Sequence, residues 1–331
     1  MLLFTPEQQA AVNAARAGFN ASQTALASQV VALIGNAAPI PLDAWRRVDT
    51  RGAMIQRDVL QVFNRLSAAN STPVGVGDIV SFYPQISDSG EVHVSMDGRS
   101  EGKADQANVK YAGTPVPVFD SYARMGWRQM EVIRKGGGLI DTETIANHQR
   151  KVAEKLEDVA LNGLSSIAVN GNTIYGLRTF PQRNTATHGL TLASSTGAQW
   201  LAAFASLLNQ LIGDNAYGRA TVFLNYGDWL YASINEFVAG YPKTILQRLQ
   251  EIQQIAEIVP CSKIPANELI GVANLATGDW GTMLSAMPLT TRPKARANPE
   301  DDYVFGVLAM AAPQLRSDYD GRSQIAHATA S

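Results

Sequence analysis

The spacing of hydrophobic and polar positions predicts three long helices. In residues 42–66, apolar residues recur every three, four or seven positions and so share one helix face: Trp45, Val48, Ile55, Val59, Val62 and Leu66. Residues 141–162 show helical spacing at Ile145, Val152, Leu156 and Val159. Gly163 follows this second helix at the position of a C-cap glycine. The third helix is predicted over residues 199–212.

Between the first two helices the period of the pattern changes to two. In residues 79–86, Val80, Phe82 and Ile86 fall on one side of an extended chain. After a turn at residues 87–90, Val92, Val94 and Met96 fall on one side of a second strand. We therefore predict a hairpin over residues 79–96 that runs into a polar stretch at residues 97–106. A long hairpin with a charged tip, inserted between helices, is typical of an arm.

The rest of the chain alternates between short strands and helices. We predict helices at residues 228–237 and 244–253, and strands at residues 220–225, 255–259, 268–273, 282–290 and 303–315. The alanine-rich N-terminal region, residues 1–41, opens with the capping-box sequence Thr5-Pro6-Glu7-Gln8 and predicts a marginal amphipathic arm. The fold class expected from these elements is α+β with mixed connections.

Composition adds limits on function. Lysine plus arginine number 27 against 29 aspartate plus glutamate, which gives a formal charge of −2. This balance argues against a dedicated nucleic-acid-binding surface, which needs clustered cations. Charged residues make up 17%, whereas soluble proteins have about 25%. A chain with so few charged residues is suited to burying much of its surface against copies of itself. No lysine or arginine precedes Arg16 and the long uncharged stretches are rich in polar residues, so we expect neither a signal peptide nor a membrane span.

Candidate chemistry is sparse. The single cysteine, Cys261, excludes an intramolecular disulfide and is interpreted as a buried structural thiol. The histidines His93, His148, His188 and His327 have no metal-ligand spacing. The loop Gly98 to Ala104 only superficially resembles a phosphate-binding loop, because alanine replaces the magnesium-binding hydroxyl. We predict no catalytic, cofactor or metal site, and a soluble enzyme with an unrecognised motif stays open as an alternative.

Four stretches, taken in order, resemble one family. The sequence Ala38-Pro39, followed by Trp45 and Val48-Asp49, is similar to the opening of the encapsulins. The hairpin region Phe82 to Met96 and the helix ending Glu157-Asp158, Gly163 and then Gly176-Leu177 resemble that family's extended loop and spine helix. Asp228-Trp229 followed by Gly240-Tyr241-Pro242 resembles its axial segment. The likeness covers the chain from about Ala38 onward.

Encapsulins share the Hong Kong 97-type fold with the major capsid proteins of tailed phages, and the resemblance implies that fold and its domains here. The implied organisation is an N-terminal arm at 1–41, peripheral-domain segments at 42–70 and 113–195, an extended hairpin loop at 71–112, an axial domain at 196–297, and a C-terminal strand and tail at 298–331 that return to the peripheral domain. The implied inter-subunit residues of the hairpin arm are Phe82, Tyr83, Ile86, Val92, Arg99 and Lys103. Ile145, Val152, Leu156 and Val159 of the spine helix are expected in the core.

Two departures favour a phage major capsid protein over an encapsulin. More than thirty residues precede the Ala-Pro motif, and residues 313–331 continue past the usual end of encapsulins. The expected function is a structural subunit of an icosahedral phage head, assembled in the host bacterial cytoplasm from hexamers and pentamers. Its expected partners are copies of itself, packaged DNA through weak non-specific contact, and candidate scaffold, portal and decoration proteins. An encapsulin-like bacterial compartment remains the first alternative.

Overall fold

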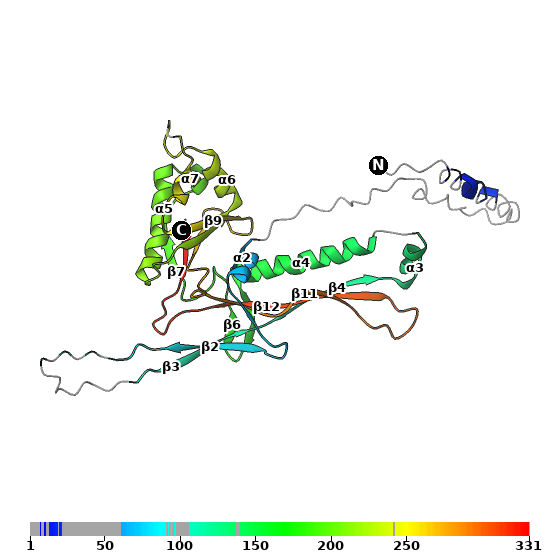
Figure 1. Cartoon of the computed structure of the whole chain (residues 1–331), viewed down its shortest axis with the longest axis horizontal. Helices are drawn as coiled ribbons and strands as arrows, with labels where there is room; N and C mark the ends of the chain where they lie inside the picture. The colour runs from blue at the N-terminus through cyan, green and yellow to red at the C-terminus, as the bar shows by residue number, and fades with distance from the viewer. Residues whose placement is uncertain are drawn as a thin grey trace. The chain divides into compact units, whose positions relative to one another are not determined.

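The computed structural model describes residues 7, 10, 13–18, 20–21, 61–90, 92, 94, 96, 106–136, 140–240 and 242–330 (Figure 1). The chain forms two compact units, Met1–Met54 and Ile55–Ser331. In the first unit, residues 13–18 are helical. The other predictions for the N-terminal arm, and the predicted helix before residue 61, lie outside the described residues. The remaining description concerns the second unit.

A four-stranded sheet and a long helix form one layer pair of this unit. The strand order is β1-β11-β12-β4, and only β1 runs parallel to its neighbour. The elements are β1 (Ser71–Pro73), β4 (Val118–Met125), β11 (Gly281–Pro293), β12 (Tyr303–Leu315) and the helix α4 (Ile140–Asn162). Figure 1 shows α4 lying along one face of the sheet. Phe119, Val307 and Ala309 of the sheet pack there against α4.

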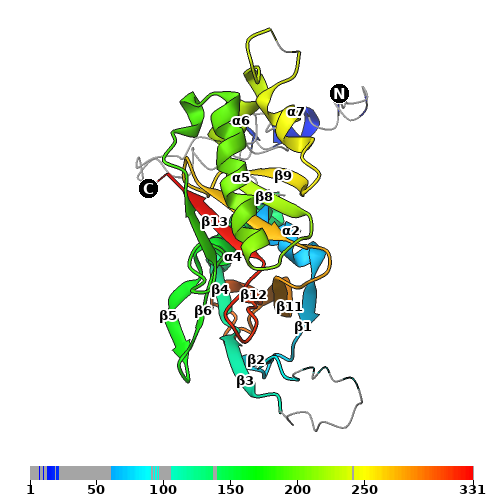
Figure 2. The ribbon, with the colours of Figure 1, turned by 90° about the vertical axis from the view of Figure 1, so that its left-hand side faces the viewer.

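A five-stranded sheet forms the second layer pair, in the order β7-β13-β10-β8-β9. Its strands are β7 (Asn184–Thr187), β8 (Ala220–Asn225), β9 (Ile255–Cys261), β10 (Leu269–Ala273) and β13 (Ile325–Thr329). The short 3-10 helix η2 (Leu192–Ser194) precedes three helices, α5 (Gly197–Gly213), α6 (Tyr226–Ile234) and α7 (Ile245–Gln250). Figure 2 shows α5 crossing the sheet. Trp200, Phe204 and Leu207 of α5 are fully buried there, and a capping box of Thr196 and Gln199 begins the helix.

Two smaller ribbons and two further helices complete the unit. The strands β2 (Val80–Ile86) and β3 (Val109–Pro115) form an antiparallel ribbon that projects from the body (Figure 1). The strands β5 (Leu164–Val169) and β6 (Asn172–Ile174) form a shorter one. The helices are α2 (Val62–Ala69) and α3 (Trp127–Gly136). No helix among the described residues is long and apolar enough to span a membrane.

The hairpin prediction was wrong in its pairing. Strand β2 pairs with β3, not with residues 91–96, and the described residues 92, 94 and 96 of that segment are not in a strand. The alternation of apolar and polar residues in 109–115, Val-Lys-Tyr-Ala-Gly-Thr-Pro, is a weaker strand signal than that of the valine-containing segment 91–96, which also lies nearer to β2 in the sequence. Pairing across a loop of more than twenty residues leaves little local signal in a sequence.

Sheet membership also differs from the predicted domain boundaries. Strand β11, predicted inside the axial domain at 196–297, lies between β1 and β12 in the four-stranded sheet. Strand β13, predicted to return to the peripheral domain, lies inside the five-stranded sheet between β7 and β10. Both assignments depend on which distant strand each segment meets, which local periodicity does not encode.

Candidate inter-subunit surface

The ribbon of β2 and β3 has one wholly apolar face. Cross-strand partners share a face, and the pairs Phe82–Gly113, Pro84–Tyr111 and Ile86–Val109 follow one another along it. Phe82 is 56% exposed, Ile86 60% and Tyr111 71%. The Phe82 ring lies across Gly113, where a Cβ would come within 2.7 Å of its Cε1. We call this surface the arm face: Phe82, Pro84, Ile86, Val109, Tyr111 and Gly113.

The opposite face of the ribbon is fastened to the body by polar contacts. Gln85 Nε2 donates to the Ser317 carbonyl at 3.1 Å and to its hydroxyl at 2.9 Å. Gln314 Nε2 donates to the Ser81 carbonyl at 3.1 Å. The Lys110 ammonium lies 3.9 Å from the centre of the Tyr319 ring. Because these contacts hold the polar face against its own chain, the arm face points away from it.

The structure divides the predicted arm residues into three groups. Phe82 and Ile86 lie on the arm face, and Val92 is 88% exposed. Tyr83 is only 8% exposed, and its hydroxyl accepts a hydrogen bond from Ser317 N, so it does not belong to an outward surface. Alternation of side chains along a strand places Tyr83 opposite Phe82. Arg99 and Lys103 lie outside the described residues.

Sequence reasoning missed the part of the arm face that β3 contributes. Val109 and Tyr111 are exposed and lie beside Ile86 and Pro84. The period-two spacing in residues 109–115 is the sequence signal that indicates this second strand.

The α4 helix packs on the four-stranded sheet and contacts the start of α2. Val152, Leu156 and Val159 are buried against the four-stranded sheet, and Ile145 packs on the same cluster while partly exposed. Glu157, on the same helix, is fully buried. Its carboxylate accepts backbone hydrogen bonds from Gln61, Val62 and Phe63 at 3.1, 2.9 and 2.7 Å, so it caps the start of α2.

An ionic network joins the end of α4 to the five-stranded sheet. The Arg178 guanidinium makes two hydrogen bonds to Glu268, at 2.8 and 2.9 Å, and a third to Asn162 Oδ1 at 2.6 Å. His327 Nε2 lies 3.0 Å from Glu268 Oε2. Burial opposes ionisation of Glu268, but the hydrogen bonds from Arg178 and His327 outweigh it and lower the pKa of Glu268. Burial lowers the pKa of His327 despite its contact with Glu268.

Cys261 is a poor nucleophile in this fold. It is buried at the end of β9, and its thiol donates to Glu157 Oε1 at 3.7 Å. Burial raises the pKa of Cys261 to about 11. The thiolate required for nucleophilic attack is therefore scarce at neutral pH.

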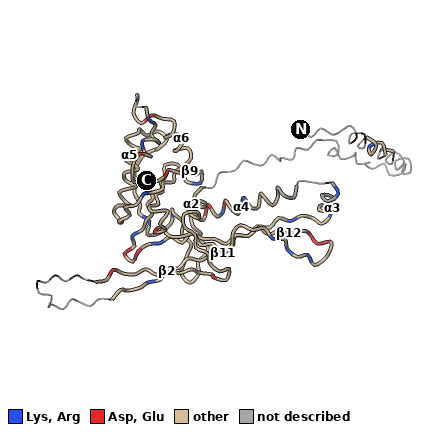
Figure 3. The backbone as a smooth tube through the Cα atoms, viewed as in Figure 1, with Lys and Arg blue, Asp and Glu red and all other residues tan. Residues whose placement is uncertain are grey.

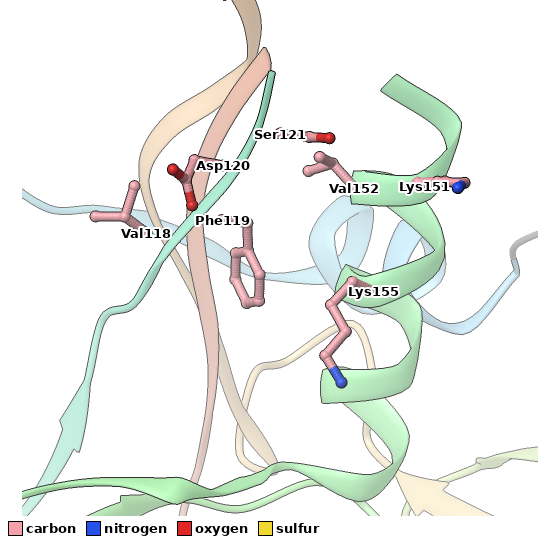
Figure 4. Close-up of a pocket in the computed structure, with 7 residues that line it drawn as sticks. All are labelled: Val118, Phe119, Asp120, Ser121, Lys151, Val152 and Lys155. Carbon is pink, nitrogen blue, oxygen red and sulfur yellow. The ribbon is translucent and has the colours of Figure 1, made fainter. Parts of the chain in front are cut away.

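A cavity of about 270 Å³ lies between the edge strand β4 and α4 (Figure 4). Val118, Phe119 and Val152 form its apolar part, and Asp120, Ser121, Lys151 and Lys155 its polar part. Ser121 Oγ lies 2.6 Å from His148 Nδ1, which brings a hydroxyl to an imidazole.

The residues that the structure describes offer no group of metal ligands. In the described part of the chain, no three histidine, cysteine, aspartate or glutamate side chains group together to hold a metal ion. Figure 3 shows residues of both charge signs along the chain, including the loop between β11 and β12. That loop carries Lys294 and Arg296 near Asp301 and Asp302. The arm face is thus the feature that most needs a partner.

Comparison with protein families matches residues 36–328 to a family of unknown function (DUF6260). The chain belongs to this family. No curated protein sequence matches the chain. Because the function of the DUF6260 family is unknown, the fold of the protein is assigned from its similarity to solved structures.

The structure of this DUF6260 protein is similar to capsids. The capsid of Myoviridae phage XM1 matches with a TM-score of 0.67 at 12% identity, covering 89% of this chain and 99% of that one. The capsid of a native GTA particle matches at 0.56 and 13%, covering 89% and 99%. A virus-like particle from Pyrococcus furiosus matches at 0.53 and 13%, covering 81% and 95%. The predicted α+β fold of the Hong Kong 97 capsid type is confirmed.

Proposed function

We propose that this protein is a structural subunit of a phage head, a shell protein rather than an enzyme. The observation that supports this most is the capsid fold over nearly the full length of phage XM1 capsid and GTA capsid chains. A second support is the exposed arm face, because a two-stranded ribbon with an apolar face is marginal in water and gains stability when a neighbour covers it.

In this proposal the ribbon lies across a neighbouring subunit and the five-stranded sheet with α5 to α7 serves as the axial domain. Contacts between such subunits are heterologous, and they close into rings when the rotation between copies closes. Hexamers and pentamers then form the shell. Burial of the exposed apolar side chains of the arm face against a neighbour favours the contact.

The proposed surroundings follow from the same role. The protein belongs to the virion and assembles in the cytoplasm of a host bacterium. Packaged DNA contacts the shell weakly and without sequence preference, which a formal charge of −2 permits. Scaffold, portal and decoration proteins are the further partners that the role brings with it.

Electron microscopy of the purified full-length protein tests the proposal, with size exclusion alongside. We expect closed shells, or rings of five and six subunits. A protein that stays monomeric over a wide concentration range would contradict the shell function and favour the enzyme alternative.

An encapsulin-like compartment is the second candidate, supported by the similarity to the virus-like particle from Pyrococcus furiosus. The content of shells purified from the native source separates the two. Nuclease-protected DNA inside supports the phage head, whereas a folded protein cargo and no DNA supports the compartment.

A further inference from the structure

A cavity of about 230 Å³ lies where the ribbon of β2 and β3 meets the rest of its own chain. The body side of the ribbon lines it with Tyr83, Gln85 and Thr114. The turn between β5 and β6 and residues 180–182 also line it. Its volume is somewhat below the roughly 300–1,000 Å³ of pockets that hold drug-sized ligands, so it suits a single small ring. We call it the ribbon cavity.

The lining of the ribbon cavity is uncharged. Among the described residues that border it, none is an aspartate, glutamate, lysine, arginine or histidine. A phosphate or carboxylate finds no cation in this lining, and an ammonium group finds no carboxylate. Because a charge that leaves water needs a partner of opposite sign, the cavity favours a neutral ligand.

Thr114 supplies a hydroxyl that the protein does not use. The residue is 7% exposed, and its hydroxyl forms no hydrogen bond with any described residue. Most buried polar side chains have a hydrogen-bond partner, so a buried one without a protein partner calls for an explanation. A ligand that hydrogen-bonds Thr114 in the cavity provides one.

Neighbouring side chains have hydrogen-bonding capacity left over. Gln85 uses its Nε2 to donate to the carbonyl and the hydroxyl of Ser317, which leaves its Oε1 as an acceptor. The Tyr83 hydroxyl accepts from Ser317 N at 3.4 Å and donates to no described residue. The exposed side-chain amide of Gln182 hydrogen-bonds no described residue and offers both a donor and an acceptor. Donors and acceptors therefore border one uncharged space.

Aromatic rings form another part of the lining. Tyr175 and Phe180 meet edge to face, with ring centres 6.2 Å apart and an angle of 65° between the rings. Phe180 is buried, whereas the Tyr175 ring is 39% exposed and available for contact. A sugar ring has C–H groups on its faces and hydroxyls around its edge. It therefore matches a site that combines an aromatic surface with uncharged donors and acceptors.

We propose that the ribbon cavity binds a neutral monosaccharide unit. Thr114, Gln85 and Gln182 hydrogen-bond its hydroxyls, and the Tyr175 ring packs on its C–H groups. A nucleotide fits this lining less well because its phosphate lacks a cation there. An extended peptide fits less well because it needs a longer groove or a free sheet edge. The inference goes beyond the proposed function and does not depend on shell assembly.

Saturation-transfer NMR of the full-length protein tests the site with glucose, galactose and mannose. We expect saturable binding of at least one of these sugars. The uronic acid of the sugar that binds carries an added carboxylate, and we expect it to bind about tenfold more weakly because the lining offers no cation.

Variants locate the sugar in the ribbon cavity. Thr114→Val keeps the shape of the side chain and removes a hydroxyl that no described residue uses. We therefore expect a sugar-free melting temperature at or above that of wild type, together with an affinity about tenfold lower. Gln182→Leu is expected to weaken binding as well. The matched controls Thr187→Val on β7 and Gln210→Leu on α5, both at exposed positions, are expected to bind like wild type.

Four results overturn the inference. The first is that none of the three sugars binds the wild-type protein, and the second is that the uronic acid binds as tightly as the neutral sugar. The third is that Thr114→Val binds as tightly as wild type. The fourth is that Thr114→Val melts clearly below wild type, because the hydroxyl would then serve the fold. Shell assembly, followed separately by electron microscopy, decides the proposed function without affecting these results.

Discussion

The buried carboxylate of Glu157 accepts a hydrogen bond from the backbone N–H of Phe63 at 2.7 Å. It also accepts hydrogen bonds from the N–H groups of Gln61 and Val62, so a side chain near the C-terminal end of α4 caps the start of α2, more than ninety residues earlier in the chain. Gln61, the N-cap residue of α2, makes no side-chain cap of its own. The contact therefore replaces a local cap with a tertiary one and ties two helices together.

Glu157→Gln is expected to destabilise the isolated subunit by about 1–3 kcal/mol. The variant replaces one carboxylate oxygen with an NH₂ group, which cannot accept a hydrogen bond from the backbone N–H groups of α2, and it removes the negative charge of the acceptor. Urea unfolding followed by circular dichroism measures the change. The control Lys151→Gln, on an exposed position of the same helix, is expected to stay within about 0.5 kcal/mol of wild type. Equal midpoints for the two variants would contradict the tertiary cap.

Gly163 ends α4 with a φ of +70°. A Cβ there would collide with the carbonyl oxygen of Ile174. Gly189 has a similar φ of +64° but open space around it, so it isolates the cost of the backbone conformation alone. Gly189→Ala is expected to cost about 1–2 kcal/mol, and Gly163→Ala clearly more.

Thermal unfolding of the two glycine variants measures the difference. The collision contributes nothing if both variants unfold at the same temperature.

A fall in pH is expected to lower the folding stability of the subunit through the protonation of His327 and Glu268. Burial lowers the pKa of His327 from its usual 6.5, so the unfolded chain takes up the proton first and stability falls as the pH drops below that value. The pKa of Glu268 is lowered from 4.5, so its contribution is present above that pH and is lost as the pH falls through the folded-state pKa.

Melting temperatures between pH 8 and pH 5 test the histidine contribution. We expect the wild-type subunit to lose stability across this range and His327→Gln to lose less. The pKa of His188 is also lowered by burial, so the melting temperature of the His327→Gln variant still falls somewhat as the pH is lowered. Identical pH profiles for wild type and His327→Gln would exclude His327 as a contributor.

The two faces of the β2–β3 ribbon are expected to respond differently to mutation. Phe82→Ser removes an exposed apolar side chain, so it leaves the unfolding free energy of the subunit within about 0.5 kcal/mol while blocking assembly. Tyr83→Ser removes a buried ring and is expected to destabilise the subunit by about 3 kcal/mol. Unfolding and electron microscopy of both variants measure the two effects.

Deletion of residues 88–105 gives a second test of the arm. We expect a folded subunit that no longer forms shells, because the segment that joins β2 to β3 is lost. Normal shells from this variant would refute the assignment of the ribbon as an assembly arm.

Local patterns in the sequence determined the helices α4 and α5 and most strands of the second half. The spacing of Val152, Leu156 and Val159 predicts the face of α4 that meets the sheet, and Gly163 marks its end, because both depend on residues within a few turns of each other. The ordered set of short motifs led to the capsid fold, which the similarity to solved capsids confirmed.

Tertiary structure alone decided which strands meet and which surfaces remain open. The partner of β2 lies beyond a loop of more than twenty residues, and β13 enters a sheet whose other strands begin as early as Asn184. Glu157 is an ordinary helix residue by its local pattern, yet it is fully buried as the cap of another helix. Tyr83 and Phe82 are adjacent aromatic residues, but body contacts bury one and leave the other exposed. Side-chain periodicity encodes two faces of a strand, whereas the body that packs against it selects which face is buried.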